Sequence, residues 1–89
     1  MTTLRFEKPA PLVPFDVEER SEIAEALKLT PGRWILLGQR EASASARQDA
    51  YLVRNGKSSW AMFGAGFEAE SRTLFGEHRI YVRYTGGGR

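Results

Sequence analysis

Three side chains within residues 43–55 have types and a spacing that suit contact with a phosphate backbone. Arg47, Tyr51 and Arg54 are separated by four and then three positions, so in a helix they lie in one row on one face. Arginine presents a planar fork of N–H donors that matches phosphate oxygens, and a tyrosine ring can stack on a base. The row therefore predicts a surface that contacts nucleic acid.

Flanking side chains extend this row, and a simpler interpretation stands beside it. Arg40 precedes the predicted helix, Lys57 follows it, and Ser43 and Ser45 offer hydroxyl groups at its start. The simpler interpretation is the solvated face of an amphipathic helix, in which the arginines serve solubility. No asparagine or glutamine accompanies the arginines in a recognition motif, so a contact of this kind is expected to be independent of base sequence.

A second, different surface is predicted from the N-terminal third of the chain. Residues 1–30 carry six acidic and four basic side chains, whereas residues 31–60 carry two acidic and five basic ones. Aromatic side chains near a proline-rich arm and the acidic face of a first helix would suit a protein partner or a second copy of the chain. This alternative surface comprises Phe6, Phe15, Glu18, Glu22 and Glu25.

Catalytic and metal chemistry finds little support among the residue types. The chain has no cysteine and a single histidine, His78, so the usual zinc ligand sets cannot be assembled. His78 is expected in a surface loop. Glu68 and Glu70 share a strand face, as acid–base pairs do, but cross-strand pairing explains them more simply. We expect a protein without catalytic activity, cofactor, metal or small-molecule substrate.

Length and composition favour one small globular domain. The chain has 89 residues, of which 42% are hydrophobic and 27% charged, and its net charge is +2. No apolar run approaches the roughly 20 residues of a membrane span, and the N-terminus lacks the apolar segment of a signal peptide. Together with the absence of cysteine, this predicts a cytoplasmic protein that does not bind membranes.

The first elements can be placed from capping and periodicity. Residues 1–15 hold three of the four prolines and are predicted to form an extended arm. Asp16 is the predicted N-cap of a helix that ends before the turn at residues 30–32. The predicted buried stripe of this helix comprises Val17, Ile23, Ala24, Leu27 and the stem of Arg20.

The next elements would position the basic row. Residues 33–39 contain a continuous apolar run, which predicts a strand covered on both sides or central in its sheet. Ser43 or Ser45 is the predicted N-cap of the second helix, and Gly56 its left-handed C-cap. Ala46, Ala50 and Val53 recur at helical spacing and should face the sheet.

The C-terminal part predicts a hairpin, which completes the fold. Residues 67–72 and 79–85 alternate as strands, and a loop at residues 73–78 would set Glu68 opposite Arg83 and cancel most of the charge on the outer sheet face. The predicted fold is α+β, in the order α-β-α-β-β, with a small antiparallel or mixed sheet and two helices on one face. The expected organisation is an arm (1–15), one domain (16–85) and a tail (86–89).

Four short segments carry a resemblance to other proteins. "PGRWILLGQ", "NGK", "GAGFEAESR" and "IYVRY" are similar to segments of short open reading frames in actinobacteria and their phages, over roughly residues 31–85. The resemblance implies a phage or actinobacterial setting and no particular activity. Residues 34–56 also look like half of a peptidoglycan-binding SPOR repeat, whose second half is missing here.

Overall fold

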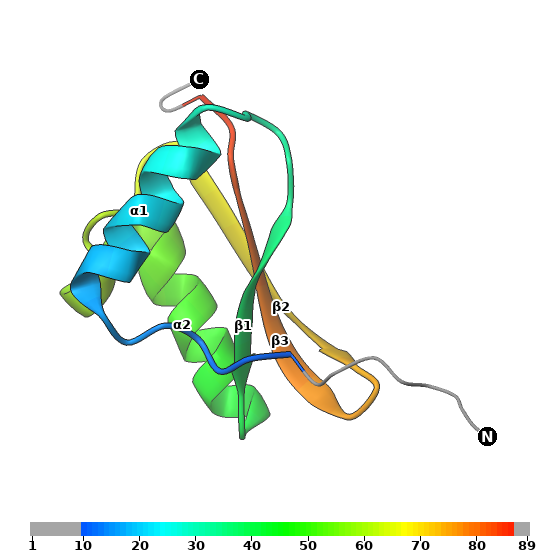
Figure 1. Ribbon diagram of the computed structural model, residues 1–89. Coiled ribbons are helices and arrows are strands. Elements are labelled where there is room, and N and C mark those ends of the chain that lie inside the picture. Colours follow the sequence, from blue (N-terminus) through cyan, green and yellow to red (C-terminus); the bar gives the residue numbers. More distant parts are fainter. Residues whose placement is uncertain (1–9, 87–89) are drawn as a thin grey trace.

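The chain follows the order helix, strand, helix, strand, strand in the computed structural model, which describes residues 10–86 (Figure 1). This is the α+β order predicted from the sequence. The elements are α1 (Val17–Lys28), β1 (Ile35–Arg40), α2 (Ser43–Asn55), a short 3-10 helix η1 (Ser58–Trp60), β2 (Phe67–Leu74) and β3 (Glu77–Tyr84).

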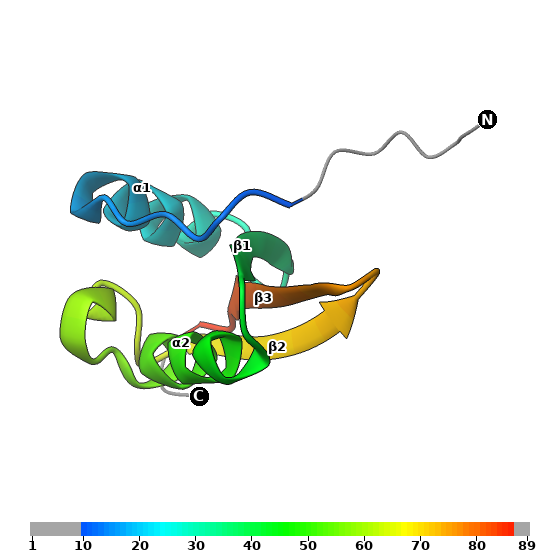
Figure 2. The same ribbon diagram turned by 90° about the horizontal axis from the view of Figure 1, so that it is seen from below.

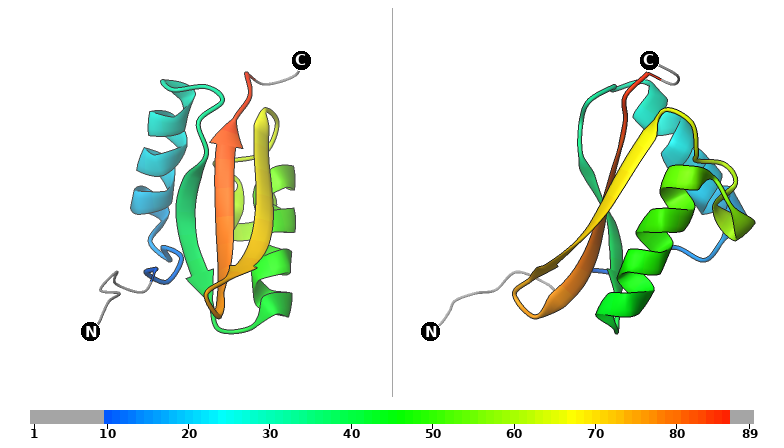
Figure 3. Two further views of the ribbon diagram at one scale, coloured as in Figure 1. Left: turned by 90° about the vertical axis from the view of Figure 1, so that its right-hand side faces the viewer. Right: turned by 180° about the vertical axis from the view of Figure 1, so that it is seen from behind.

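The three strands form an antiparallel sheet in the order β1-β3-β2, with both helices on one face. The left view of Figure 3 looks onto the other face, which no helix of the described chain covers. The expectation that residues 33–39 form a central or doubly covered strand is therefore wrong. Leu37 is buried beneath the helices, whereas Trp34 lies toward the open face and remains 39% exposed.

Residues 11–13 run along the outer edge of β1 and belong to the domain. Gln39 N donates to Pro11 O at 2.9 Å, and Val13 N donates to Gln39 O at 3.3 Å. Val13 is fully buried in the core, so the domain begins earlier than the predicted boundary at residue 16. Gly38 permits this approach, because a Cβ there would lie 2.6 Å from the Cα of Val13.

The helices cap and pack largely as their sequences predict. Asp16 accepts a hydrogen bond from Glu18 N at the start of α1, and Gly56 ends α2 in the left-handed conformation. The predicted serine cap of α2 is wrong, because the helix begins at Ser43 and its N-cap is Ala42, which has no side chain able to cap. Val17 is 57% exposed rather than buried, while Val13 of the preceding segment is in the core.

The core lies between the sheet and the helices. Ala46, Ala50 and Val53 of α2 face it as expected, and Ala24 and Leu27 come from α1. An aromatic series fills the space at one end: the ring centroids of Trp60 and Phe63 are 5.8 Å apart, and those of Phe63 and Phe67 are 5.1 Å apart. This packing fixes α2 against β2 and β3, and so decides which side of α2 meets solvent.

The hairpin has the predicted register and a shorter loop. Glu68 pairs with Arg83 and Arg72 with Arg79, as alternation required. The strands continue to Leu74 and Glu77, so only two residues, Phe75 and Gly76, form the turn, both at positive φ. His78 therefore lies in β3 and not in a loop, which corrects the sequence-based expectation.

Candidate functional site

The basic row lies along the flank of α2 beside the outer edge of β2. Arg47 and Arg54 are exposed and Tyr51 is 43% exposed, whereas the neighbouring side of α2, with Ala46, Ala50 and Val53, is buried. Neither arginine forms an ion pair with a carboxylate within residues 10–86. The row is thus presented to solvent with its positive charge unbalanced by acidic neighbours.

Lys57 extends the row beyond the end of α2. The left-handed conformation of Gly56 turns the chain back, and Lys57 Nζ lies 3.5 Å from the hydroxyl of Tyr51 and 5.6 Å from the centroid of its ring. Asn55 Nδ2 donates to Tyr51 O, so the last turn of the helix is held by a side chain as well as by its cap. Lys57 therefore adds a third cation to this surface, beside Tyr51.

Arg54 reaches from α2 to the sheet. Its NH1 atom donates to Ala69 O of β2 at 2.8 Å. The guanidinium group is thereby anchored at the outer edge of β2 while it keeps further N–H donors. Its orientation is thus fixed by a backbone contact and not by a carboxylate.

Arg40 does not belong to the row, contrary to the sequence-based grouping. Its NH1 atom lies 3.3 Å from Asp49 Oδ2, in an ion pair whose aspartate side chain is only 9% exposed. Its guanidinium carbon also lies 5.9 Å from the ring centroid of Phe15. A cation held by a buried carboxylate adds little to the attraction of an external phosphate, so Arg40 is removed from the predicted contact set.

Asp49 and Arg20 form a buried charged cluster that was not expected from the sequence. Arg20 is 4% exposed; it donates to Pro14 O at 2.6 Å and to Ser59 O at 2.8 Å, and its guanidinium carbon lies 3.6 Å from the centroid of Trp60. Burial raises the pKa of Asp49, and the charges of Arg40 and Arg20 only partly offset it. Burial likewise lowers the pKa of Arg20. One available signal was the position of Asp49, three residues after Ala46 and beside Ala50.

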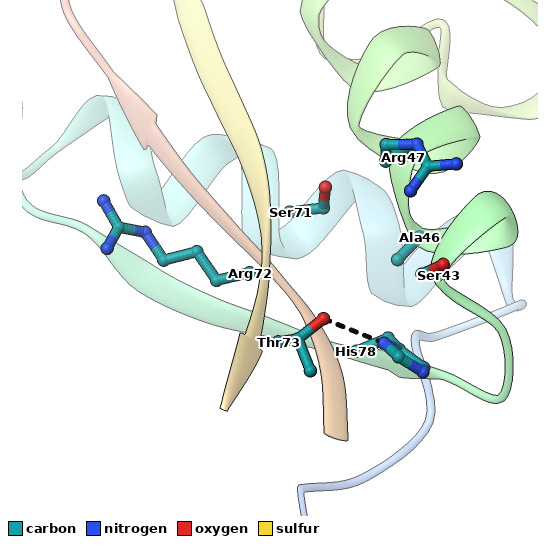
Figure 4. A pocket seen from close by; sticks show the side chains of 7 residues that line it. All are labelled: Ser43, Ala46, Arg47, Ser71, Arg72, Thr73 and His78. Carbon is teal, nitrogen blue, oxygen red and sulfur yellow. Dashed lines mark hydrogen bonds between the residues drawn. The ribbon is translucent and has the colours of Figure 1, made fainter. Parts of the chain in front are cut away.

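A polar hollow of about 190 Å³ opens between α2 and the end of the hairpin that carries its turn (Figure 4). Thr73 Oγ1 and His78 Nδ1 are hydrogen-bonded at 3.0 Å on its sheet side. In Figure 4 the side chain of Arg72 points away from the hollow, to the other side of β2. The residues that line the hollow are Ser43, Ala46, Arg47, Ser71, Arg72, Thr73 and His78.

The outer face of the sheet carries as many arginines as acidic partners. Arg83 NH2 lies 2.7 Å from Glu68 Oε1, Arg72 NH2 lies 3.1 Å from Glu70 Oε2, and Arg79 NH2 lies 2.8 Å from Glu77 Oε1. Hydrogen bonds to Tyr81 and Glu77 raise the pKa of Arg79. The predicted cancellation of charge on this face is thus present in the structure.

The alternative surface near the arm is also exposed where it is described. Phe15 is 66% exposed and, with Leu12 and Arg40, borders an open hollow of about 310 Å³. The acidic residues proposed for this surface, Glu18, Glu22 and Glu25, are exposed along α1. Phe6, the remaining member, lies outside the described residues.

Three further findings bear on function. No group of three or more histidine, aspartate or glutamate side chains in residues 10–86 is arranged to hold a metal ion. Neither α1 nor α2, the α-helices of the described chain, has the length and apolarity needed to cross a bilayer. Comparison with protein-family models, with curated proteins and with solved structures finds no match for the chain.

Proposed function

We propose that this protein is a small non-catalytic binding module that contacts the backbone of nucleic acid through the exposed face of α2. Arg47, Arg54 and Lys57 would bind phosphates, and Tyr51 would pack against the sugar or a base. The proposed setting, the cytoplasm of an actinobacterium or of a phage-infected host, is supported by the resemblance of residues 31–85.

The observation that carries this proposal is the pairing of the cations. Within residues 10–86, five basic side chains form ion pairs with carboxylates: Lys28, Arg40, Arg72, Arg79 and Arg83. Over the same range, the exposed basic side chains outside that set are Arg33 and the three cations Arg47, Arg54 and Lys57. In the described part of the chain, three of the four exposed cations without an ion pair thus lie on α2 or just after its C-cap, and such a cluster attracts a polyanion.

A salt titration with fluorescent duplex and single-stranded oligonucleotides tests the proposal. Three phosphate contacts predict a slope of log K against log salt of roughly −2 to −3, and hence a loss of roughly 20- to 40-fold between 50 and 200 mM salt. The double variant Arg47→Glu/Arg54→Glu should abolish measurable binding.

A matched control separates the α2 face from net charge. Arg33 is exposed, lies just before β1 at the opposite edge of the sheet from β2, and forms no ion pair within residues 10–86. Arg33→Glu changes the net charge by the same amount as Arg47→Glu and should weaken binding far less. Equal losses for these two single variants, or binding that is insensitive to salt, would contradict the proposal.

A protein partner is the second candidate function, and the exposed aromatic side chain of Phe15 favours it. Phe15 and Leu12 flank an open hollow, and Glu18, Glu22 and Glu25 are exposed on α1, the helix that follows Phe15, so this part of the chain offers both apolar area and negative charge. Residues 11–13 already pack on their own domain, so an exchanged arm would first have to leave β1. Light scattering of the wild type and of Phe15→Ser tests this candidate: a dimer that survives high salt and is lost in the variant would support it, and a monomer at all concentrations would count against self-association.

A further inference from the structure

The outer edge of β2 has no strand partner within residues 10–86. β2 stands last in the order β1-β3-β2, so its other side is open (Figure 2). In an antiparallel pair, the N–H and C=O groups of alternate residues point toward the neighbouring strand, and those of the residues between them point away. Thr85 N donates to the carbonyl oxygen of Gly66, just before β2. The backbone N–H and C=O groups of the even-numbered residues of β2 therefore point toward β3.

The contact from Arg54 identifies the residues that point to the open side. Arg54 NH1 donates to Ala69 O, and Arg54 lies on α2 rather than on β3. By the same alternation, the backbone groups of Ser71 and Thr73 also point away from β3. Ala69 O is occupied by Arg54, and the backbone groups of Ser71 and Thr73 form no other hydrogen bond in the described chain. An edge of this kind is a template for another strand.

Two arginines of α2 lie beside this edge of β2. The hollow of about 190 Å³ separates Ser71 and Thr73 from Ser43 and Arg47 of α2, which leaves space on the helix side of the edge (Figure 4). Arg54 lies farther along the same helix, beside Ala69. A strand added here would therefore run past two arginines that no carboxylate within residues 10–86 neutralises.

The alternation of an added strand specifies its chemistry. Its side chains would point in turn to the helix side and to the outer sheet face. Those on the helix side would meet Arg47 and Arg54, which favours carboxylates. Those on the outer face would lie beside Glu70 and Arg72, which already neutralise each other at 3.1 Å, and this favours uncharged β-branched residues.

We propose that the edge of β2 from Ala69 to Thr73 binds an extended acidic peptide segment by strand addition, with its carboxylates facing Arg47 and Arg54. The proposal does not rest on nucleic-acid binding. Both ligands would use the same two arginines, so they should compete.

A second copy of the chain is a poorer occupant of this edge. Antiparallel pairing of two β2 strands about a two-fold axis would keep both helical layers on the same side of a continuous sheet. α2 lies over β2 and β3 (Figure 2), and so the two α2 helices would meet with Arg47 and Arg54 of each copy facing one another. Like charges at such a contact repel, whereas a strand of acidic residues is attracted.

The test uses the peptide acetyl-Thr-Glu-Val-Glu-Thr-amide, whose five residues span about 17 Å as a strand, with the wild-type protein labelled for NMR. Two control peptides are matched to it: one has lysine in place of both glutamates, and one is N-methylated at the amides that would face the edge. We expect the acidic peptide to bind, the lysine peptide to show no binding, and N-methylation to weaken binding by roughly tenfold or more.

Amide hydrogen exchange locates the site within the protein. In the free protein the amides of Ser71 and Thr73 should exchange faster than those of Glu70 and Arg72, which point toward β3, and the acidic peptide should slow the first pair selectively. Ser71→Pro removes an N–H that points to the open side and leaves the bonds to β3 in place, so it should abolish peptide binding with little change in the melting temperature. If that variant fails to fold, the N-methylated peptide provides the same test without a change to the protein.

Four results would overturn the proposal. Equal binding of the N-methylated peptide would exclude strand addition, and equal binding of the lysine peptide would exclude an acidic ligand. Protection of Ser71 and Thr73 that rises with protein concentration and needs no peptide would assign the edge to a second copy. Protection of these amides by an oligonucleotide but not by the peptide would assign it to nucleic acid.

Discussion

The exposed face of α2 and the outer face of the sheet carry similar side chains and differ in how their charges are paired. On the sheet, Arg72, Arg79 and Arg83 surround Tyr81, and each forms an ion pair with a glutamate. On α2, Arg47 and Arg54 flank Tyr51 and have no carboxylate partner in the described chain. The number of arginines is therefore a poor guide to an anion-binding surface.

This difference in pairing matters because a neighbouring carboxylate reduces the electrostatic field of an arginine as well as affecting the stability of the fold. An exposed ion pair stabilises a fold by less than about 1 kcal/mol, yet it presents almost no net charge to a ligand several ångströms away. Within residues 10–86, the unbalanced cations that remain lie mainly on one helix face. Variants that change the pairing of charges on one surface or the other therefore test this difference.

The largest expected effect comes from removing the carboxylate that holds Arg40 and faces Arg20. Asp49→Ala leaves two partly or fully buried guanidinium groups without their counter-charge, and should lower the free energy of unfolding by about 3 kcal/mol. Urea unfolding measures this loss. Glu41→Ala, at an exposed acidic residue without an ion pair in the described structure, is the control and should change stability by less than about 0.5 kcal/mol. A loss below about 1 kcal/mol for Asp49→Ala would show that the cluster is not important for stability.

Removing two glutamates from the outer face of the sheet should create a second surface that binds nucleic acid, like the one proposed for α2. Glu68→Gln/Glu70→Gln leaves Arg83 and Arg72 without their partners. If the ion pairs are what keeps this face from binding nucleic acid, the double variant should bind oligonucleotides more tightly than the wild type at low salt. Its salt slope should be steeper by up to about 1.8. An unchanged slope would mean that the geometry of the sheet, and not its acidic residues, prevents binding.

The pH dependence of stability should reveal the burial of Asp49. Because burial raises its pKa in the folded state, the folded protein binds the proton more readily than the unfolded chain does. The stability that this raised pKa contributes is fully present below the unfolded pKa of about 3.9, and it is lost as pH rises through the folded pKa. The stability of the wild type relative to Asp49→Asn should therefore increase on acidification from about pH 7 to about pH 4 in thermal melts. A relative stability that decreases over this range would show that Arg40 and Arg20 outweigh burial.

The smallest expected effect is on the stability that the outer-face pairs contribute. Glu68→Ala removes the cross-strand pair with Arg83, whose side chains are half and one-third exposed, and should reduce the free energy of unfolding by less than about 1 kcal/mol. Guanidinium denaturation measures it. A larger loss would show that this pair has a structural role beyond cancelling charge.

The sequence predicted the fold well because its signals are local. Alternation over residues 67–72 and 79–85 specified the hairpin register, and the spacing of Ala46, Ala50 and Val53 specified which side of α2 is buried. The spacing of Arg47, Tyr51 and Arg54 in the sequence was therefore enough to place them in one row. The errors at the start of α2 and at the hairpin loop are shifts of boundaries by a few residues.

The features that the sequence did not predict depend on tertiary contacts. The pairing of Arg40 with Asp49 joins β1 to α2, and the burial of Arg20 requires carbonyl groups from Pro14 and Ser59. The apolar run at residues 34–37 has the composition of a central strand, yet β1 stands first in the order β1-β3-β2, and residues 11–13 pair with it at Gln39. The hollow beside Thr73 likewise depends on how far α2 covers the hairpin, which no local pattern encodes.

The role of unpaired arginines in nucleic-acid binding is tested by comparing Arg47→Gln with Arg83→Gln, because each variant removes one arginine and one positive charge. Oligonucleotide affinity is measured for both variants and the wild type across a salt series. We expect Arg47→Gln to reduce the magnitude of the salt slope by about 0.9 and to weaken binding at every salt concentration, whereas Arg83→Gln should leave the slope unchanged. The opposite order, or equal slopes for the two variants, would contradict this role of the unpaired arginines.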